Sequence, residues 1–323
     1  MAAELKDVPS GVEAATLGGC TLPEYAKATV HCQKLAWIFD EVPRIQLDFG
    51  SDHKKFHFKV GSSIYDLFKS ETEFKFERTK TDTTFTCKKT SRNPPSRMSI
   101  LEEYTKKYLE LLVVDKFEVH FNQFQKYDII NCFIWKITNK LYGIYFNPTQ
   151  EVIFTPEQIR FLLEDVTAQI FTLPKIKLSS EVKLEVLHSK PIRHERINFY
   201  CEFLPFEYFI KMECKRVIAR TDMIHVADLN EFVKAWIRGK RLLNLKSFII
   251  HFSDMKGELT YEEVLRDIKS SQENKKEITE LDVSSLNLND DGGNEGHTIV
   301  RSVDDALATV LLKDKTFSLI IKD

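Results

Sequence analysis

The stretch from Val226 to Phe252, VADLNEFVKAWIRGKRLLNLKSFIIHF, restricts the fold more than any other part of the chain. Its apolar residues recur at i, i+3, i+4, i+7 and i+8, so they share one face of a helix. They are Leu229, Phe232, Val233, Trp236 and Ile237. Asp228, with Glu231 three residues later, is typical of a capping box at the start of this helix. Gly239 is expected to end it, because glycine tolerates a left-handed backbone.

A short basic turn and an apolar run, Phe248–Ile250, follow Gly239. A run of this length is typical of a strand that is covered on both faces. The whole segment therefore predicts a scaffold unit of one helix and one buried strand. It contains no residue pattern suited to chemistry.

Composition limits the classes of protein that this chain can belong to. Its 323 residues suffice for two domains or for one elongated array of repeats. A hydrophobic content of 43% and 24 Phe residues indicate an aromatic-rich core rather than a disordered chain. A net charge of −2 argues against a protein built wholly around nucleic acid or an anionic membrane.

The cysteines and the apolar runs indicate the compartment. The six cysteines are scattered and form no CxxC pair, which favours free thiols in a reducing compartment. No apolar run approaches the roughly 18 residues that a membrane helix needs. The first twenty residues contain acids where a secretory signal has a basic start. We therefore expect a cytoplasmic or nuclear protein without a cofactor.

The chain divides by pattern into five parts. They are a loose N-terminus (1–25), a helix (26–43, with its periodicity over Ala26–Asp40), a small antiparallel β region (44–90), a linker (91–98) and a repeat-like domain (99–323). Alternating apolar residues such as Ile45 and Leu47 predict the strands of the β region. The Pro94–Pro95 pair marks the linker. Ser99, with Glu102, predicts the capping box of the next helix.

Helix and strand patterns alternate through the repeat-like domain. Strand starts near 117, 141, 182, 216 and 247 are separated by roughly 24 to 41 residues. Thr155, followed by Pro156 and Gln158, predicts a capped helix start between two of them. Residues 270–296 are expected to form a flexible acidic loop, and two strands close the chain. The predicted fold is α/β, an irregular leucine-rich-repeat-like strand–helix solenoid preceded by the small antiparallel β region.

The block LNEFVKAWIRGKRLLNLKSFIIHF (229–252) resembles the most recognisable motif of the nematode F-box-associated family, type 2. Segments 108–124, 217–229 and 297–321 are similar to other parts of that domain, so the resemblance spans about two thirds of the chain. It implies a non-enzymatic protein-interaction module. The implied role is a substrate-recognition subunit of an SCF-type ubiquitin ligase, whose partners are a protein target, the Skp adaptor and the cullin ligase.

The front of the chain departs from the family pattern. An F-box opens with a Leu-Pro signal and continues through several packed helices. Here only about 20 residues separate Leu22–Pro23 from the strand predicted at Ile45. The segment Ala26–Asp40 is interpreted as the remnant of the last F-box helix. The resemblance therefore leaves adaptor binding open, since docking to the adaptor requires the missing helices.

Three small motifs suggest chemistry, and each has a simpler interpretation. His53 and His57 have the spacing of zinc ligands on a helix, but they lie on a predicted strand pair without a third ligand. His31 and Cys32 are adjacent and should therefore point in different directions. The stretch 290–296 is rich in glycine but lacks the Lys-Ser or Lys-Thr of a phosphate loop. We expect no catalytic, cofactor or metal site.

The basic segment 78–97 supports an alternative function. It contains six cations and one acid, Asp82, near Phe85, a composition that single-stranded nucleic acid can bind. The cations are Arg78, Lys80, Lys88, Lys89, Arg92 and Arg97. The alternative function is a nucleic-acid-binding accessory protein.

The central helix offers a second set of candidate contacts. Trp236 lies on its apolar stripe and is expected in the core. Arg238, Lys240 and Arg241 fit the negative end of the helix dipole and need no ligand. The residues that bind a partner are not indicated by the sequence.

Overall fold

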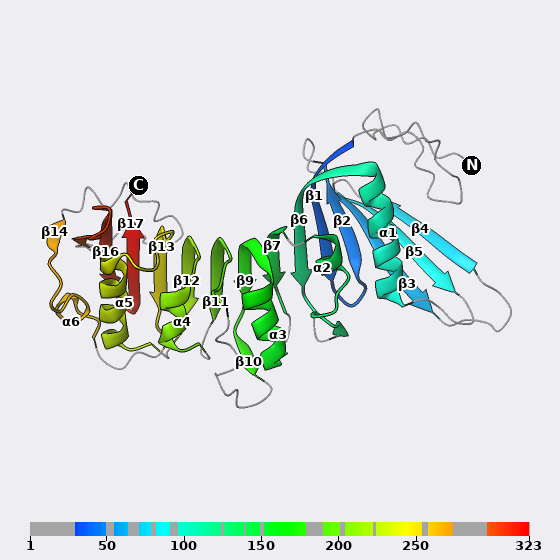
Figure 1. Ribbon diagram of the computed structural model, residues 1–323. Coiled ribbons are helices and arrows are strands. Elements are labelled where there is room, and N and C mark those ends of the chain that lie inside the picture. Colours follow the sequence, from blue (N-terminus) through cyan, green and yellow to red (C-terminus); the bar gives the residue numbers. More distant parts are fainter. Residues whose placement is uncertain are drawn as a thin grey trace. The chain divides into compact units, whose positions relative to one another are not determined.

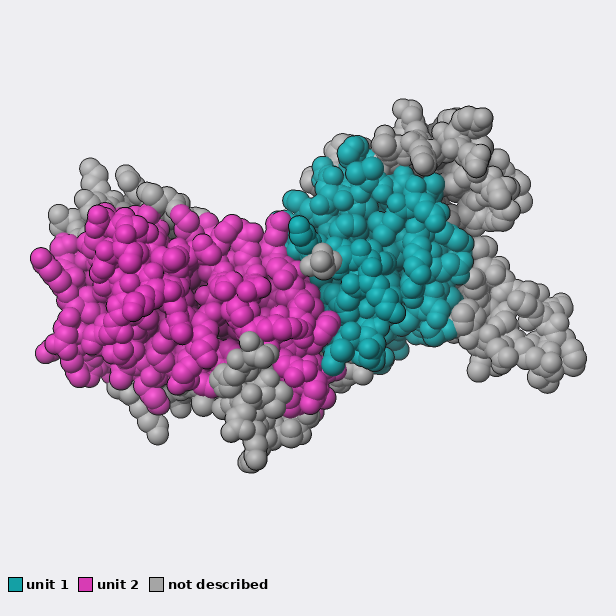
Figure 2. Space-filling model, in the orientation of Figure 1, with its two compact units in different colours: residues 1–142 teal, residues 143–323 magenta. Residues whose placement is uncertain are grey.

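A computed structural model describes thirteen stretches of the chain, and it divides into two compact units, residues 1–142 and 143–323 (Figure 2). The described residues are 30–49, 55–63, 71–78, 82–90, 96–123, 126–138, 140–148, 152–178, 190–200, 204–221, 224–253, 258–273 and 296–322.

The first unit is a mixed sheet with the strand order β6-β1-β2-β3-β5-β4. Its strands are β1 (Val30–Phe39), β2 (Arg44–Asp48), β3 (Lys55–Ser63), β4 (Glu71–Arg78), β5 (Asp82–Thr90) and β6 (Leu112–Phe121). β1 pairs with β6, and β3 with β5, in parallel. The other neighbours are antiparallel. Helix α1 (Arg97–Leu111) lies against this sheet, and α2 (Ile134–Ile137) is a single turn (Figure 1).

Aromatic stacking fixes the core of the first unit. Trp37 on β1 is fully buried and stacks on Phe117 of β6, with 5.6 Å between ring centres. Its Nε1 donates a hydrogen bond to Thr105 Oγ1 on α1 at 3.0 Å, which satisfies a buried polar group. Phe39 stacks in the same way on Phe121 at 5.0 Å. The parallel register of β1 and β6 places both ring pairs on one face.

Two expectations for this unit are wrong. The helix expected over Ala26–Asp40 is strand β1 from Val30 to Phe39. The run Leu35–Phe39 is buried throughout, and a strand covered on both faces has the same continuous apolar pattern as a buried helix. Helix α1 begins earlier than expected, since the Ser99 amide donates to Ser96 Oγ at 3.0 Å.

The second unit contains a larger mixed sheet with the order β14-β15-β16-β17-β13-β12-β11-β9-β7. Its strands are β7 (Lys140–Phe146), β9 (Thr167–Leu173), β11 (Arg196–Tyr200), β12 (Arg216–Arg220), β13 (Ser247–His251), β14 (Ser271–Glu273), β15 (Gly296–Val300), β16 (Leu307–Lys313) and β17 (Thr316–Ile321). Strands β9, β11, β12 and β13 are parallel to one another. The remaining pairs, β13–β17, β17–β16, β16–β15 and β15–β14, are antiparallel. A separate parallel pair joins β8 (Val152–Phe154) and β10 (Ile176–Leu178).

Helices α4 (Phe206–Lys211) and α5 (Val226–Arg238) cover the same face of this sheet (Figure 1). Phe232 of α5 stacks on Phe248 of β13 at 4.0 Å between ring centres, and Phe209 of α4 meets the same ring edge-on at 5.8 Å. The helices of the unit are α3 (Pro156–Arg160), which continues into the π-helical turn η2 (Phe161–Asp165), α4 (Phe206–Lys211), α5 (Val226–Arg238) and α6 (Tyr261–Val264).

The predicted strand–helix solenoid is wrong. A solenoid of this kind continues with parallel strands, whereas β13 pairs antiparallel with β17 and the closing strands form antiparallel hairpins. The region predicted as a small antiparallel sheet also contains the parallel pair β3–β5. Both units are mixed sheets. Apolar periodicity marks the strands, but it does not state which strand pairs with which, or in which direction.

The central helix is confirmed in most details. Trp236 is fully buried, and Gly239 has the left-handed φ of 63° expected after the last turn. The cap differs: helix α5 begins at Val226, so Asp228 is its third residue, and its carboxylate accepts from the His225 amide at 2.8 Å. The capping box at Thr155 is confirmed as predicted.

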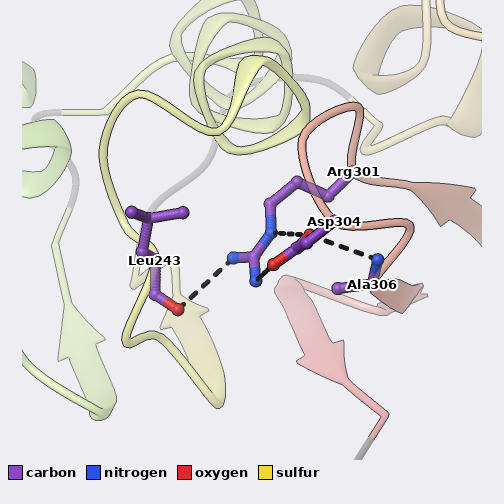
Figure 3. A network of polar contacts seen from close by, with 4 residues as sticks. All are labelled: Leu243, Arg301, Asp304 and Ala306. Atoms are coloured by element: carbon purple, nitrogen blue, oxygen red, sulfur yellow. Dashed lines mark hydrogen bonds and ion pairs between the residues drawn. The ribbon is translucent and has the colours of Figure 1, made fainter.

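Arg301 ties the β15–β16 turn to the connection between α5 and β13 (Figure 3). Its Nε and Nη2 donate to the two carboxylate oxygens of Asp304 at 2.8 and 2.7 Å. Its Nη1 donates to the carbonyl of Leu243 at 3.4 Å, and its guanidinium lies 5.1 Å from the ring centre of Trp236. These contacts compensate the burial of the Arg301 charge.

Gly239→Ala is expected to lower the free energy of unfolding by about 2 kcal/mol or more. A left-handed backbone costs an L-residue about 1–2 kcal/mol, and the added Cβ would overlap the Val303 side chain. Combining it with Val303→Ala removes the overlap but keeps the backbone strain, so the double variant should recover only part of the loss. Urea unfolding of the three proteins measures this, and an unchanged Gly239→Ala midpoint would contradict it.

Candidate interaction groove

Parallel pairing brings three connections together at one edge of the second sheet. Arg196, Arg216 and Ser247, the first residues of β11, β12 and β13, are direct neighbours in the register. The segments that lead into these strands must therefore meet at that edge. Backbone hydrogen bonds join them: the Lys246 amide donates to the Lys215 carbonyl at 2.7 Å, and the Lys215 amide to the Glu195 carbonyl at 2.9 Å.

A groove of about 480 Å³ lies between these connections. Its volume falls within the roughly 300–1,000 Å³ of known ligand pockets. Its floor is apolar, and each floor residue is at most 6% exposed. The floor residues are Ile192, Met212, Cys214, Leu242 and Leu245. Charged residues also line it: Lys190, Lys211, Glu213, Lys240 and Arg241.

The charges around the groove are unbalanced. Glu213 is paired with Arg193 at 3.0 Å, and Lys190 with Asp165. Lys211, Lys240 and Arg241, here called the rim cations, are exposed and have no ion-pair partner within the part of the chain that the structure describes. The groove therefore presents three uncompensated positive charges above an apolar floor.

The connection between α5 and β13 is held in an uncommon conformation. Leu242 has a φ of 61°, a left-handed value that is unfavourable for a bulky side chain. The Leu242 carbonyl accepts from the Leu245 amide at 3.1 Å, which closes the turn. This turn leaves Leu243 53% exposed while Arg301 binds its carbonyl. The connection is thus held by its own turn and by Arg301. It presents the Leu243 side chain beside the rim cations.

Two groups in the groove have raised pKa values. Burial raises the pKa of the Cys214 thiol to about 12, so it is neutral and acts as part of the apolar floor. Burial, assisted by the negative charge of Glu164, raises the pKa of the Tyr208 hydroxyl. Neither group supplies an anion at neutral pH. The groove is therefore suited to binding through its cations and apolar atoms.

His194 fixes the groove-lining segment that leads into β11. Its Nε2 lies 2.9 Å from the Leu162 carbonyl, and its Nδ1 accepts from the Ala168 amide at 3.2 Å. These two bonds require the neutral ring with the proton on Nε2. Burial lowers the pKa of His194 to about 4, although the Leu162 bond acts in the opposite direction. The ring stacks on Phe171 at 4.3 Å.

Residues 184–250 match the family described as F-box associated. This stretch is therefore similar to an F-box-associated segment. Every residue that lines the groove, from Lys190 to Leu245, lies within it. Comparison of the chain with curated proteins and with solved structures gives no match. An F-box-associated segment indicates a role in protein–protein interaction, and the groove is the surface that this segment builds.

The structure separates the basic residues at the end of the central helix. Lys240 and Arg241 line the groove, while Arg238 belongs to the last turn of α5. The sequence interpretation assigned all three to the helix dipole and missed the groove. Lys211, from α4, was not singled out at all. The available signal was the Leu-Leu pair that follows Arg241, because an apolar pair in a basic turn leaves one side chain outside the core.

The other sequence candidates do not come together. His31 is exposed and 3.8 Å from Asp115, while Cys32 is buried and burial raises its pKa. Neighbours on a strand point to opposite faces, so they form no nucleophile–base pair. His57 lies on β3, opposite Thr84 in the register. The remaining candidates, His53 and the glycine-bearing stretch 290–295, lie outside the described residues.

The basic segment 78–97 is divided between two strands and a helix. β4 ends at Arg78, Lys88 and Lys89 lie on β5, and α1 begins at Arg97. The guanidinium of Arg97 donates to a backbone carbonyl at 2.9 Å. The nucleic-acid alternative stays a prediction for this segment. The other cations of the segment lie outside the described residues: Lys80 and Arg92.

Besides Arg301 in the second unit, the first unit contains a buried charged residue, Glu118. Glu118 on β6 is 3.3 Å from Lys34 Nζ and 3.1 Å from His120 Nε2. Burial would raise its pKa, but the His120 hydrogen bond and the Lys34 charge together keep the pKa below its usual value. The cluster is explained by its own internal pairing.

Among the described residues, no three His, Cys, Asp or Glu side chains gather as metal ligands. None of the helices described is long and apolar enough to cross a membrane.

Lowering the pH is expected to destabilise the second unit through His194. Because its folded pKa is about 4 and its ordinary value is 6.5, the unfolded chain takes up the proton first as the pH falls below 6.5. Stability is complete above that pH and falls towards pH 4, by about 2 kcal/mol at pH 5. His194→Gln should lose about 2 kcal/mol less than the wild type between pH 7.5 and pH 5 in urea unfolding. Equal losses would contradict the assignment.

Proposed function

We propose that this chain is a non-enzymatic recognition subunit that holds a target protein in its groove for an SCF-type ubiquitin ligase. The observation that carries the proposal is that one F-box-associated segment supplies every residue lining the groove. The partner classes are a protein target, the Skp adaptor and the cullin ligase. The resemblance of Leu229–Phe252 to the nematode type 2 pattern supports the same assignment, with a cytoplasmic or nuclear location.

The chemistry of the groove supports binding over catalysis. Its thiol, Cys214, is protonated at neutral pH, and its one lining carboxylate, Glu213, is paired with Arg193. Cations over an apolar floor attract and hold a ligand without exchanging a proton. This is the composition of an interface, with an apolar centre and a polar border.

The link to the ligase depends on adaptor binding. Val30–Phe39, interpreted from sequence as part of the last F-box helix, is the strand β1 and pairs with β2 and β6. A strand with both edges occupied cannot also serve as a docking helix. Adaptor binding therefore requires helices from another part of the protein. Without them, the chain would act as a free-standing target-binding protein.

Calorimetric titration of purified full-length protein with the Skp adaptor tests this half. Under the ligase role we expect a dissociation constant of about 1 μM or tighter, corresponding to about −8 kcal/mol. A protein with an intact F-box is the positive control. Absence of binding while the control binds would remove the ligase role and leave a target-binding protein detached from its ligase.

A further inference from the structure

We propose that the groove binds an extended acidic segment of a partner protein, with its negative side chains at Lys211, Lys240 and Arg241 and an apolar side chain against Leu243. This inference rests on the proposed function and specifies its target. It assigns a partner of stated chemistry to a surface for which the family match names none.

The groove is surrounded by an excess of positive charge. Two acids beside the groove are already engaged: Asp165 pairs with Lys190, and Glu213 with Arg193. The rim cations have no ion-pair partner within the part of the chain that the structure describes. Three like charges held around one groove repel each other, and an anionic ligand relieves that repulsion. The expected complement is thus negative.

Exposed apolar side chains lie beside the rim cations. Leu243 is 53% exposed, lines the groove and is fixed through its carbonyl by Arg301. Three further exposed apolar residues belong to the β15–β16 hairpin that Arg301 also anchors: Val300, Val303 and Leu307. Val300 and Leu307 are direct partners in the antiparallel register. Exposed apolar side chains gathered near a charged groove are typical of a protein-binding site.

The groove is better suited to a peptide than to nucleic acid. Nucleic-acid sites use a stripe of cations that follows the phosphate backbone and aromatic faces for the bases. Here the three cations surround an apolar floor, and the one aromatic residue in the lining, Tyr208, is buried and offers no exposed face on which a base could stack. A short acidic segment with one apolar residue matches both parts of the surface.

The test is a selection of random twelve-residue peptides displayed on phage against the full-length protein. We expect enrichment of peptides that carry several Asp or Glu residues next to Leu, Ile or Phe. The best peptide, labelled with fluorescein, is then titrated by polarisation against wild type, Lys211→Glu, Arg241→Glu and Leu243→Ser. Each variant should weaken binding about tenfold or more, the effect of losing one good contact.

Lys269→Glu is the matched control, because Lys269 is exposed on the same unit, lies outside the groove and carries the same charge change. It should change the affinity less than twofold. Replacing the acids of the peptide by phosphoserine distinguishes carboxylate from phosphate recognition, and a twelve-base single-stranded DNA tests the nucleic-acid class. Tighter binding of the DNA than of the peptide would overturn the inference.

The outcomes separate this inference from the proposed function. Enrichment of apolar peptides without acids, still weakened by Leu243→Ser, overturns the acidic preference and leaves the groove as a protein-binding site. Binding that none of the three groove variants weakens places recognition elsewhere and contradicts both. Failure to enrich any peptide contradicts the acidic-segment inference, whereas binding to a folded partner would remain consistent with the proposed function.

Discussion

The in-register parallel pairing of β11, β12 and β13 is the constraint on which the groove depends. Their aligned first residues bring the segments before each strand to one edge of the sheet. The same register aligns the buried Ile197, Val217 and Phe248 on the face under the helices. A shift of one residue would turn a whole strand's apolar side chains to the other face. Core packing thus maintains the alignment that forms the groove.

Phe248 is the centre of that packing. Its ring contacts Phe232 of α5, Phe209 of α4 and Phe317 of β17, with ring centres 4.0, 5.8 and 6.4 Å apart. These contacts hold α4 and α5 on the sheet, and the rim cations lie at the end of α4 and just after α5. Arg301 then anchors the α5–β13 connection from the hairpin side. The interaction surface is exposed, but every element that carries it is fixed by buried aromatic contacts.

Local patterns in the sequence predicted local structure well. Helical periodicity located α5, and Gly239 marked its end, because both depend on residues within a few positions of each other. Strand β1 was mistaken for a helix, since its continuous apolar run fits either element and its parallel pairing with β6 involves residues far along the chain. The mixed sheet was missed for the same reason. The groove was missed because the sequence does not show which acids form ion pairs in the fold. Whether Lys240 and Arg241 lack an ion-pair partner depends on those distant pairs.

Photo-cross-linking from position 243 tests most directly whether the groove binds a protein. Full-length protein with benzoylphenylalanine in place of Leu243 would be irradiated in native extract, with the same group at exposed Lys269 as the control. The account predicts a discrete cross-linked partner from position 243, absent from position 269 and competed away by unlabelled wild type but not by Lys211→Glu. No cross-link from position 243, or the same products from both positions, would contradict it.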